Sequence, residues 1–63
     1  MTKLAMYRKA RGLSQSMLAV ESGLSKRLIQ QYEGKYRNIN RAAAETVKIL
    51  ADTLGCNMED LLE

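Results

Sequence analysis

The sequence predicts an all-α fold, a compact bundle of five helices that share one core. Three observations predict it: proline is absent, β-branched residues are scattered without strand alternation, and apolar residues recur at spacings of three and four. Such spacings mark one face of a helix, not its whole circumference. The chain has 63 residues, enough for one hydrophobic core and not for two, so we expect a single domain over residues 1–63.

Polar caps and glycines set the boundaries of the expected helices. Four polar residues stand just before apolar-periodic segments, where each can accept a hydrogen bond from a free first-turn amide: Ser14, Ser25, Asn40 and Asn57. Four glycines stand where helices are expected to stop: Gly12, Gly23, Gly34 and Gly55. The predicted helices therefore cover residues 3–11, 15–22, 26–33, 41–54 and 58–62.

The apolar stripe of each helix defines the expected core. The first three helices contribute Leu4, Tyr7, Leu18, Ala19, Leu28, Ile29 and Tyr32. The last two contribute Ala44, Val47, Leu50, Ala51, Leu54 and Leu61, with Met58 or Leu62 beside it. Three apolar residues, Met17, Ile39 and Ile49, lie off these stripes, and we expect them at the surface.

Charge is distributed unevenly along the chain. Residues 1–41 carry nine basic and two acidic side chains, whereas residues 42–63 carry one basic and five acidic ones. The net charge of +3 therefore conceals a basic segment followed by an acidic one. Such polarity orients a protein toward a polyanion, although an unevenly charged, solvated surface would give the same pattern.

The sequence lacks the residues that several classes of function require. The chain has no histidine and a single cysteine, Cys56, so we expect neither an internal disulfide nor a metal site, and no cofactor is implied. There is no Ser-His or Cys-His pair and no phosphate-binding glycine loop, so we do not expect an enzyme. Neither a signal peptide nor a membrane-spanning apolar run is present, which favours a soluble, cytoplasmic protein.

A tight turn separates the second and third predicted helices. Ala19 and Gly23 are four residues apart, and Ile29 lies six residues beyond Gly23. Gly23 can adopt the left-handed conformation that closes such a turn, and a side chain larger than that of Ala19 would collide with the next helix. Two short helices joined in this way predict a helix-turn-helix, although many helical hairpins share the pattern.

Residues spread along most of the chain match a longer pattern. They are Gly12 to Gln15, Leu18, Ala19, Gly23, Ser25, Ile29, Glu33, Leu50, Ala51, Leu54, Gly55 and Asp60 to Leu62. In this order they resemble the phage-repressor-like, or Xre/Cro-type, helix-turn-helix family. The resemblance implies a five-helix, lambda-repressor-like domain that binds double-stranded DNA, usually as a dimer. It also implies that the third helix lies in the major groove and that the protein acts as a transcriptional repressor or regulator.

The third helix carries the side chains that we expect to reach DNA bases. A helix in the major groove presents its first turn and the positions one turn later, where only long donors or amides reach base edges. We expect Lys26, Arg27 and Gln31 to read bases, with Gln30 as the next candidate. Arg and Lys suit the two acceptors of guanine, and Gln can donate to and accept from adenine. The alternative is that these four side chains only solvate an exposed face.

A second set of side chains is expected to contact phosphates. Gln15 stands in the first turn of the second helix, where free amides favour an anion, and it matches the family position that touches the DNA backbone. The other candidates follow the third helix and are Lys35, Tyr36, Arg37, Asn38 and Arg41, of which Arg37 and Asn38 rank highest. Such contacts position a protein on DNA without reading its sequence.

The resemblance also implies one structural ion pair. In the family, a basic residue of the first helix commonly pairs with the glutamate that ends the third helix, and Arg8 and Glu33 occupy those places. We therefore expect a partly buried pair that ties the first helix to the third. The alternative is two unrelated surface charges that contribute little to stability.

These features together predict a sequence-specific, DNA-binding transcriptional regulator that forms a homodimer, in solution or only on DNA. Any dimer must use the domain's own surface, for example Met58 and Leu62 in the fifth helix. The alternative is a small protein-interaction module, such as an antitoxin-like adaptor, that docks an acidic partner through its basic face. Exposed apolar side chains at Met17, Ile39 and Ile49 would favour that alternative.

Overall fold

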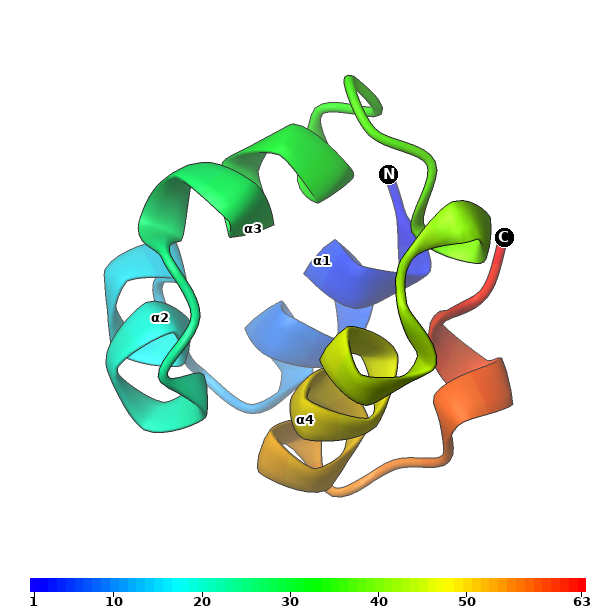
Figure 1. The fold of residues 1–63 in the computed structure, drawn as a ribbon. Helices are drawn as coiled ribbons and strands as arrows, with labels where there is room; N and C mark the ends of the chain where they lie inside the picture. Colours follow the sequence, from blue (N-terminus) through cyan, green and yellow to red (C-terminus); the bar gives the residue numbers. More distant parts are fainter.

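Four α-helices and two 3₁₀ turns follow one another in the computed structural model, which describes residues 1–63 (Figure 1). The helices are α1 (Lys3–Ala10), α2 (Gln15–Ser22), α3 (Lys26–Glu33) and α4 (Ala44–Leu54). The 3₁₀ turns are η1 (Ile39–Arg41) and η2 (Met58–Leu61). The all-α class is confirmed, but the count of five helices is wrong, because the last expected helix is only a short 3₁₀ turn.

Side-chain caps begin the first three helices. Ser14 Oγ accepts a hydrogen bond from the Met17 amide at 3.0 Å, and Ser25 Oγ accepts one from Leu28 at 3.1 Å. Both of these caps were expected from the sequence. Thr2 provides an unexpected third cap, because its Oγ1 accepts a hydrogen bond from the Ala5 amide at 3.2 Å. Each cap satisfies an amide that the helix itself leaves free.

The expected fourth helix, residues 41–54, begins later than predicted, at Ala44. Asn40 is not its cap, because Asn40 lies within η1, and the side chain of Asn38 caps that turn. The amide of Asn40 instead bonds the backbone of Glu63: Oδ1 accepts from Glu63 N–H at 2.8 Å, and Nδ2 donates to the Glu63 carbonyl at 3.1 Å. A residue predicted to start a helix therefore fastens the C-terminal segment to η1.

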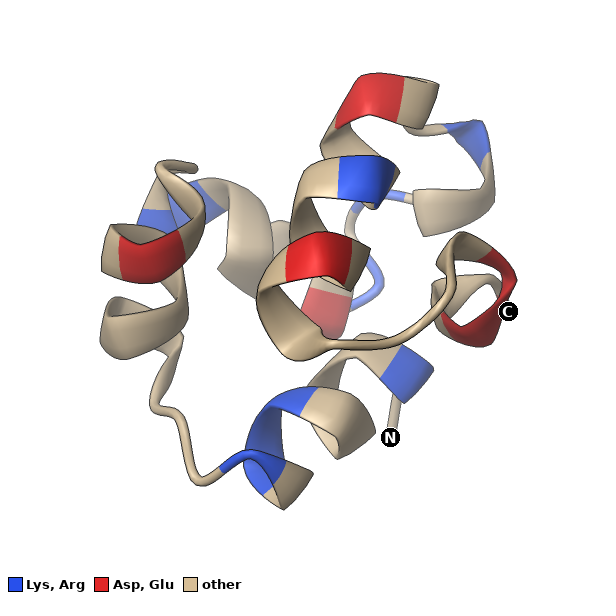
Figure 2. Ribbon diagram, turned by 90° about the horizontal axis from the view of Figure 1, so that it is seen from below, with Lys and Arg blue, Asp and Glu red and all other residues tan.

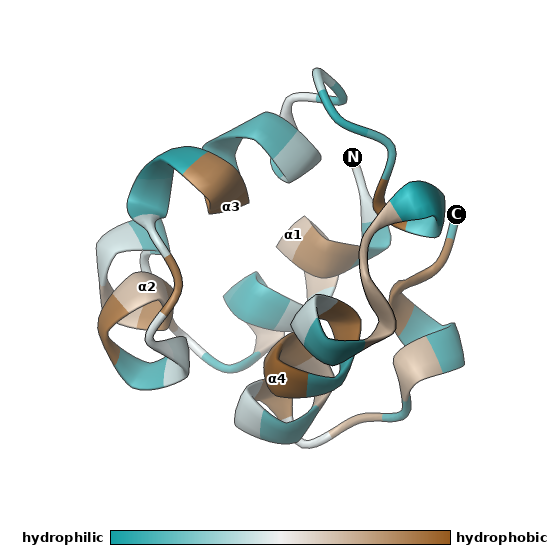
Figure 3. Ribbon diagram, viewed as in Figure 1, coloured by the Kyte–Doolittle hydropathy of each residue, from teal (hydrophilic) through white to brown (hydrophobic).

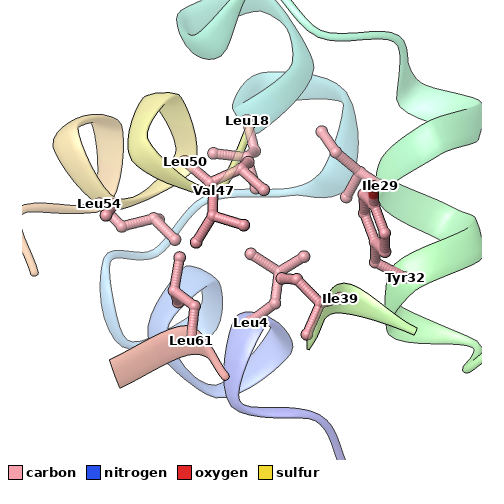
Figure 4. Close-up of a cluster of buried hydrophobic side chains, with 10 residues drawn as sticks. Leu4, Leu18, Ile29, Tyr32, Ile39, Val47, Leu50, Leu54 and Leu61 are labelled. Carbon is pink, nitrogen blue, oxygen red and sulfur yellow. The ribbon is translucent and has the colours of Figure 1, made fainter. Parts of the chain in front are cut away.

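The core lies between the helices and draws on every element (Figure 4). Its ten buried members are Leu4, Leu18, Ile29, Tyr32, Ile39, Val47, Leu50, Ala51, Leu54 and Leu61. Two expectations were wrong. Ile39 is buried, because η1 turns back across the core, and Ala44 is exposed at the start of α4. Met17 is exposed as expected, whereas Ile49 is half-buried.

The turn between α2 and α3 spans only residues 23–25. Gly23 has a φ of 77° and donates its N–H to the carbonyl of Ala19 at 2.9 Å, which ends α2. Leu24 packs against the core from the middle of the turn. The two helices are therefore held in the fixed, steep arrangement of a helix-turn-helix (Figure 1).

Acidic residues gather in the C-terminal part of the fold and basic ones in the N-terminal part, although α4 also carries Lys48 and α3 ends in Glu33. In Figure 2, viewed from the side opposite α3, red residues lie on α4 and around the C-terminus, whereas α1 carries blue ones. Arg11 of the α1 end donates Nη1 to the carbonyl of Leu54 at 3.0 Å, where it neutralises the negative end of α4. None of the helices combines the length and the apolar character needed to span a lipid bilayer.

Candidate nucleic-acid interface

The helix α3 has two chemically distinct faces. Ile29 and Tyr32 are buried, with Ile29 wholly enclosed by the core. Lys26, Arg27 and Gln30 are exposed, and Gln31 is half-buried. Figure 3 shows the same division along the ribbon, with a short hydrophobic segment between hydrophilic ones. The four side chains that we expected to read bases thus lie outside the core on one helix.

A two-point ion pair fixes the C-terminal end of α3. Arg8 donates Nε to Glu33 Oε2 at 2.7 Å and Nη2 to Glu33 Oε1 at 2.8 Å. The two side chains are only 10% and 8% exposed. The third guanidinium nitrogen, Nη1, donates to the carbonyl of Leu13 at 2.8 Å, so all three guanidinium nitrogens donate a hydrogen bond. The pair therefore joins α1, the α1–α2 link and α3.

The ion pair shifts the protonation of both partners. Burial by itself would raise the pKa of the Glu33 carboxyl, but the hydrogen bonds from Arg8 and Gln15 and the charge of Arg8 outweigh it and lower that pKa. The hydrogen bond to Glu33 raises the pKa of Arg8 above its already high ordinary value. Both groups are consequently charged at neutral pH.

Gln15 belongs to this network. Its Nε2 donates to Glu33 Oε1 at 3.0 Å, which fixes the side chain at the start of α2 against the end of α3. One hydrogen of the amide stays available, since an amide nitrogen carries two. The sequence pointed to Gln15 as a phosphate contact and gave no sign of its bond to Glu33, because the two residues are 18 positions apart.

The segment after α3 folds back onto the helix end. Lys35 has a φ of 63°, the one positive value outside glycine. The backbone amides of Tyr36 and Arg37 then donate to the same carbonyl, that of Gln31, at 2.9 and 3.1 Å. Lys35, Tyr36, Arg37 and Asn38 are all exposed, and the reversal brings Tyr36 and Arg37 next to the outward face of α3.

Two side chains from different expected sets meet at this reversal. Arg37 donates Nε to Gln31 Oε1 at 2.7 Å. Gln31 also lines a hollow of about 350 Å³ together with Arg27, Gln30 and Tyr36. The sequence offered no signal for this contact, because it depends on the positive φ of Lys35.

The remaining expected phosphate contacts are spread beside this segment. Arg37 and Asn38 both line a second hollow, of about 420 Å³, that also reaches Arg41. Asn38 uses its Oδ1 to accept from the amide of Asn40 at 2.9 Å, so its amide nitrogen faces outward for another partner. The candidates after α3 are therefore neighbours in space as well as in sequence.

The sequence of the chain matches a helix-turn-helix family model over residues 4–61, from α1 to η2. The protein therefore belongs to the helix-turn-helix family of the phage-repressor-like, Xre/Cro type, and the resemblance of its residues is confirmed. This is a family of DNA-binding regulatory domains and not of enzymes. No curated protein matches the sequence closely enough to add a relative.

Proposed function

We propose that the protein binds a specific sequence of double-stranded DNA with α3, residues 26–33, in the major groove. The observation that carries the proposal is the division of α3 into a buried face, with Ile29 and Tyr32, and an outward face of long cationic and amide side chains. Base edges in the major groove are recognised by donors and acceptors of this kind. Lys26, Arg27 and Gln31 contact bases in this arrangement, and Gln30 stands beside them.

Phosphate contacts come from both sides of α3. Gln15 keeps one amide hydrogen for the DNA backbone at the start of α2. The exposed residues Lys35, Tyr36, Arg37, Asn38 and Arg41 contact the backbone beyond the other end of the helix. Residues 1–63 act as one DNA-binding domain, because the contacts of Arg8 with Glu33 and of Asn40 with Glu63 join its distant segments.

The protein acts as a homodimer that represses transcription by occupying its site. One helix of eight residues offers only three or four side chains to base edges, which define a single half-site. A half-site of that size recurs too often in a genome to be distinguished from competing DNA. Two copies on a two-fold-symmetric site double the number of base pairs that are read, whether they pair in solution or only on the DNA.

Selection of bound duplexes from a random DNA pool tests this proposal. We expect enrichment of a palindrome whose half-sites are about 34 Å apart, which is one turn of DNA. Lys26→Ala should lose preference at one position of each half-site. Lys48→Ala is a matched control, since Lys48 is an exposed lysine of α4, and it should select the same site as the unaltered protein. Retention of no DNA, or of DNA without any preferred sequence, would contradict the proposal.

The alternative of a protein-docking module has less support. Exposed side chains at Met17, Ile39 and Ile49 would have supported docking through the basic face, but Ile39 is buried in the core and Ile49 is half-buried. Met17 is 48% exposed and lines a hollow with Val20, which is 83% exposed, but an apolar patch of two side chains is ordinary for a protein surface. Binding of an acidic protein with no retention of duplex DNA would favour this alternative.

A further inference from the structure

The side chain of Gln31 is hydrogen-bonded to that of Arg37. The bond between Arg37 Nε and Gln31 Oε1 is 2.7 Å long, and the Arg37 amide also donates to the Gln31 carbonyl at 3.1 Å. Residue 37 is thus attached to residue 31 through both side chain and backbone. The positive φ of Lys35 closes the intervening reversal, so the contact is part of the local fold.

This contact decides which end of the Gln31 amide can meet a partner. A guanidinium group only donates hydrogen bonds, so the atom that faces it has to be the amide oxygen. The Nε2 group, with two hydrogens, has no partner within the protein and remains free. Arg37 does not line the hollow that Gln31 shares with Arg27, Gln30 and Tyr36.

We infer that the Gln31–Arg37 pair makes this position selective for guanine, an inference that rests on the proposed binding of α3 in the major groove. A free glutamine suits adenine, because it can donate to N7 and accept from the N6 amino group. In this protein one lone pair of that acceptor is bound to a cation, which turns the oxygen toward Arg37 and leaves the Nε2 donors to face a base. Guanine presents two acceptors, N7 and O6, at its major-groove edge, whereas the adenine N6 amino group would meet another donor.

In this arrangement Arg37 does more than contact a phosphate. As a phosphate contact alone, Arg37 would strengthen binding to all sequences equally. As a positioning residue, it orients the base-reading amide of Gln31 and so influences a single base pair. Arg41 provides a matched comparison, because it is an exposed arginine near the same helix end that makes no hydrogen bond to α3.

The test compares duplexes that carry the selected site with guanine or adenine at one base pair. That base pair is identified as the one where Gln31→Ala loses preference. The unaltered protein should bind the guanine duplex about tenfold or more tightly than the adenine duplex. Arg37→Met should reduce this ratio at least severalfold or reverse it toward adenine. Arg41→Met should weaken binding to both duplexes and leave the ratio unchanged.

A second variant removes the hydrogen-bond donor of the Gln31 side chain and keeps its contact with Arg37. Gln31→Glu keeps an oxygen for Arg37 but has no hydrogen to donate, so it should lose the preference for guanine while Arg37 stays in place. The Arg37 side-chain Nε–H signal in NMR spectra of the free protein reports that contact. It should exchange slowly with water in the unaltered protein and in Gln31→Glu, and quickly in Gln31→Ala.

Results that contradict guanine selectivity differ from results that contradict the proposed DNA binding. Selection of a site in which Gln31→Ala affects no base pair, or in which that base pair is adenine, would overturn the inference alone. An equal loss for both duplexes in Arg37→Met would do the same, since Arg37 would then be only a phosphate contact. A failure of the unaltered protein to select any site would instead contradict the proposed function.

Discussion

Arg8 of α1 and Glu33 of α3 form a two-point ion pair across 25 residues of sequence, with N–O distances of 2.7 and 2.8 Å. Gln15 adds a third hydrogen bond to the same carboxylate. The end of the helix that we place in the major groove is therefore fixed to both preceding helices. Because a recognition helix has to meet several base edges at once, such fixation favours binding in a single orientation.

A double-mutant cycle measures this pair. Arg8→Ala and Glu33→Ala should each lower the free energy of unfolding by about 3 kcal/mol, since each leaves a charge almost buried without its partner. The double variant should cost less than the sum of the two by at least about 1 kcal/mol. The exposed pair of Lys48 and Asp52, 3.0 Å apart, is the control, and its cycle should give at most about 0.5 kcal/mol. Additive losses at Arg8 and Glu33 would show that the two charges are independent.

The lowered pKa of Glu33 predicts a dependence of stability on pH. The unfolded chain binds a proton at Glu33 more readily than the folded chain, so stability rises with pH through this range. The contribution is complete above the unfolded pKa of about 4.3 and is lost as the pH falls through the folded pKa. Urea unfolding between about pH 5 and about pH 3 should therefore show a weaker pH dependence for Glu33→Gln than for the unaltered protein. Identical pH dependences would contradict the shift.

The close approach of the Tyr36 ring to Gly34 predicts the effect of a substitution at Gly34. Gly34 has an ordinary φ of −84°, but a Cβ there would stand 2.8 Å from a ring carbon of Tyr36. Tyr36 is 86% exposed and its ring can swing away, which leaves a tight 3.1 Å approach to the Gln30 carbonyl, so Gly34→Ala should change stability by less than about 1 kcal/mol. Gly34→Ala should nevertheless weaken DNA binding, because the ring is displaced. In a Tyr36→Ala background the same change should leave DNA affinity unaltered, and a full effect there would assign the loss to another cause.

At Gly23 the backbone conformation, and not crowding by a neighbour, predicts the effect of a substitution. A Cβ at Gly23 would meet no atom within 4 Å, but the residue has a φ of 77°. Gly23→Ala should therefore lower the free energy of unfolding by about 1 kcal/mol through backbone strain alone. Gly23→Asn should cost less, because asparagine tolerates the left-handed conformation better than alanine. Chemical unfolding of the two variants measures the difference, and an equal loss for both would exclude strain as the cause.

Local chemistry explains which parts of the fold could be predicted from the sequence. Ser14 and Ser25 cap the amide three residues ahead, and Gly23 ends a helix through its own backbone conformation, so neighbouring residues are enough to predict them. Asn40 has the same cap chemistry, but its partner is Glu63, 23 residues away. Ile39 was misplaced for a related reason, since the helical period does not extend into the link that carries it.

The candidate nucleic-acid interface likewise has a part that could be predicted from the sequence and a part that could not. The outward position of Lys26 and Arg27 follows from the period of α3, because Ile29 and Tyr32 fix its buried side. The bond between Gln31 and Arg37 could not be predicted, because it requires a left-handed conformation at Lys35, a residue type that rarely adopts one. The side-chain types at the surface were thus evident from the sequence, but their mutual orientation was not.

Mapping of amide NMR shifts during titration with duplex DNA tests whether α3 lies in the major groove. A mixed-sequence duplex of about two helical turns at low salt suffices, because phosphate contacts support binding without a preferred site. We expect the shift changes to concentrate on α3 and on residues 35–38, to include Gln15, and to leave the outer surface of α4 unaffected. Changes centred on α4 or η2, or no changes at DNA concentrations that saturate other helix-turn-helix domains, would contradict the placement of α3 in the major groove.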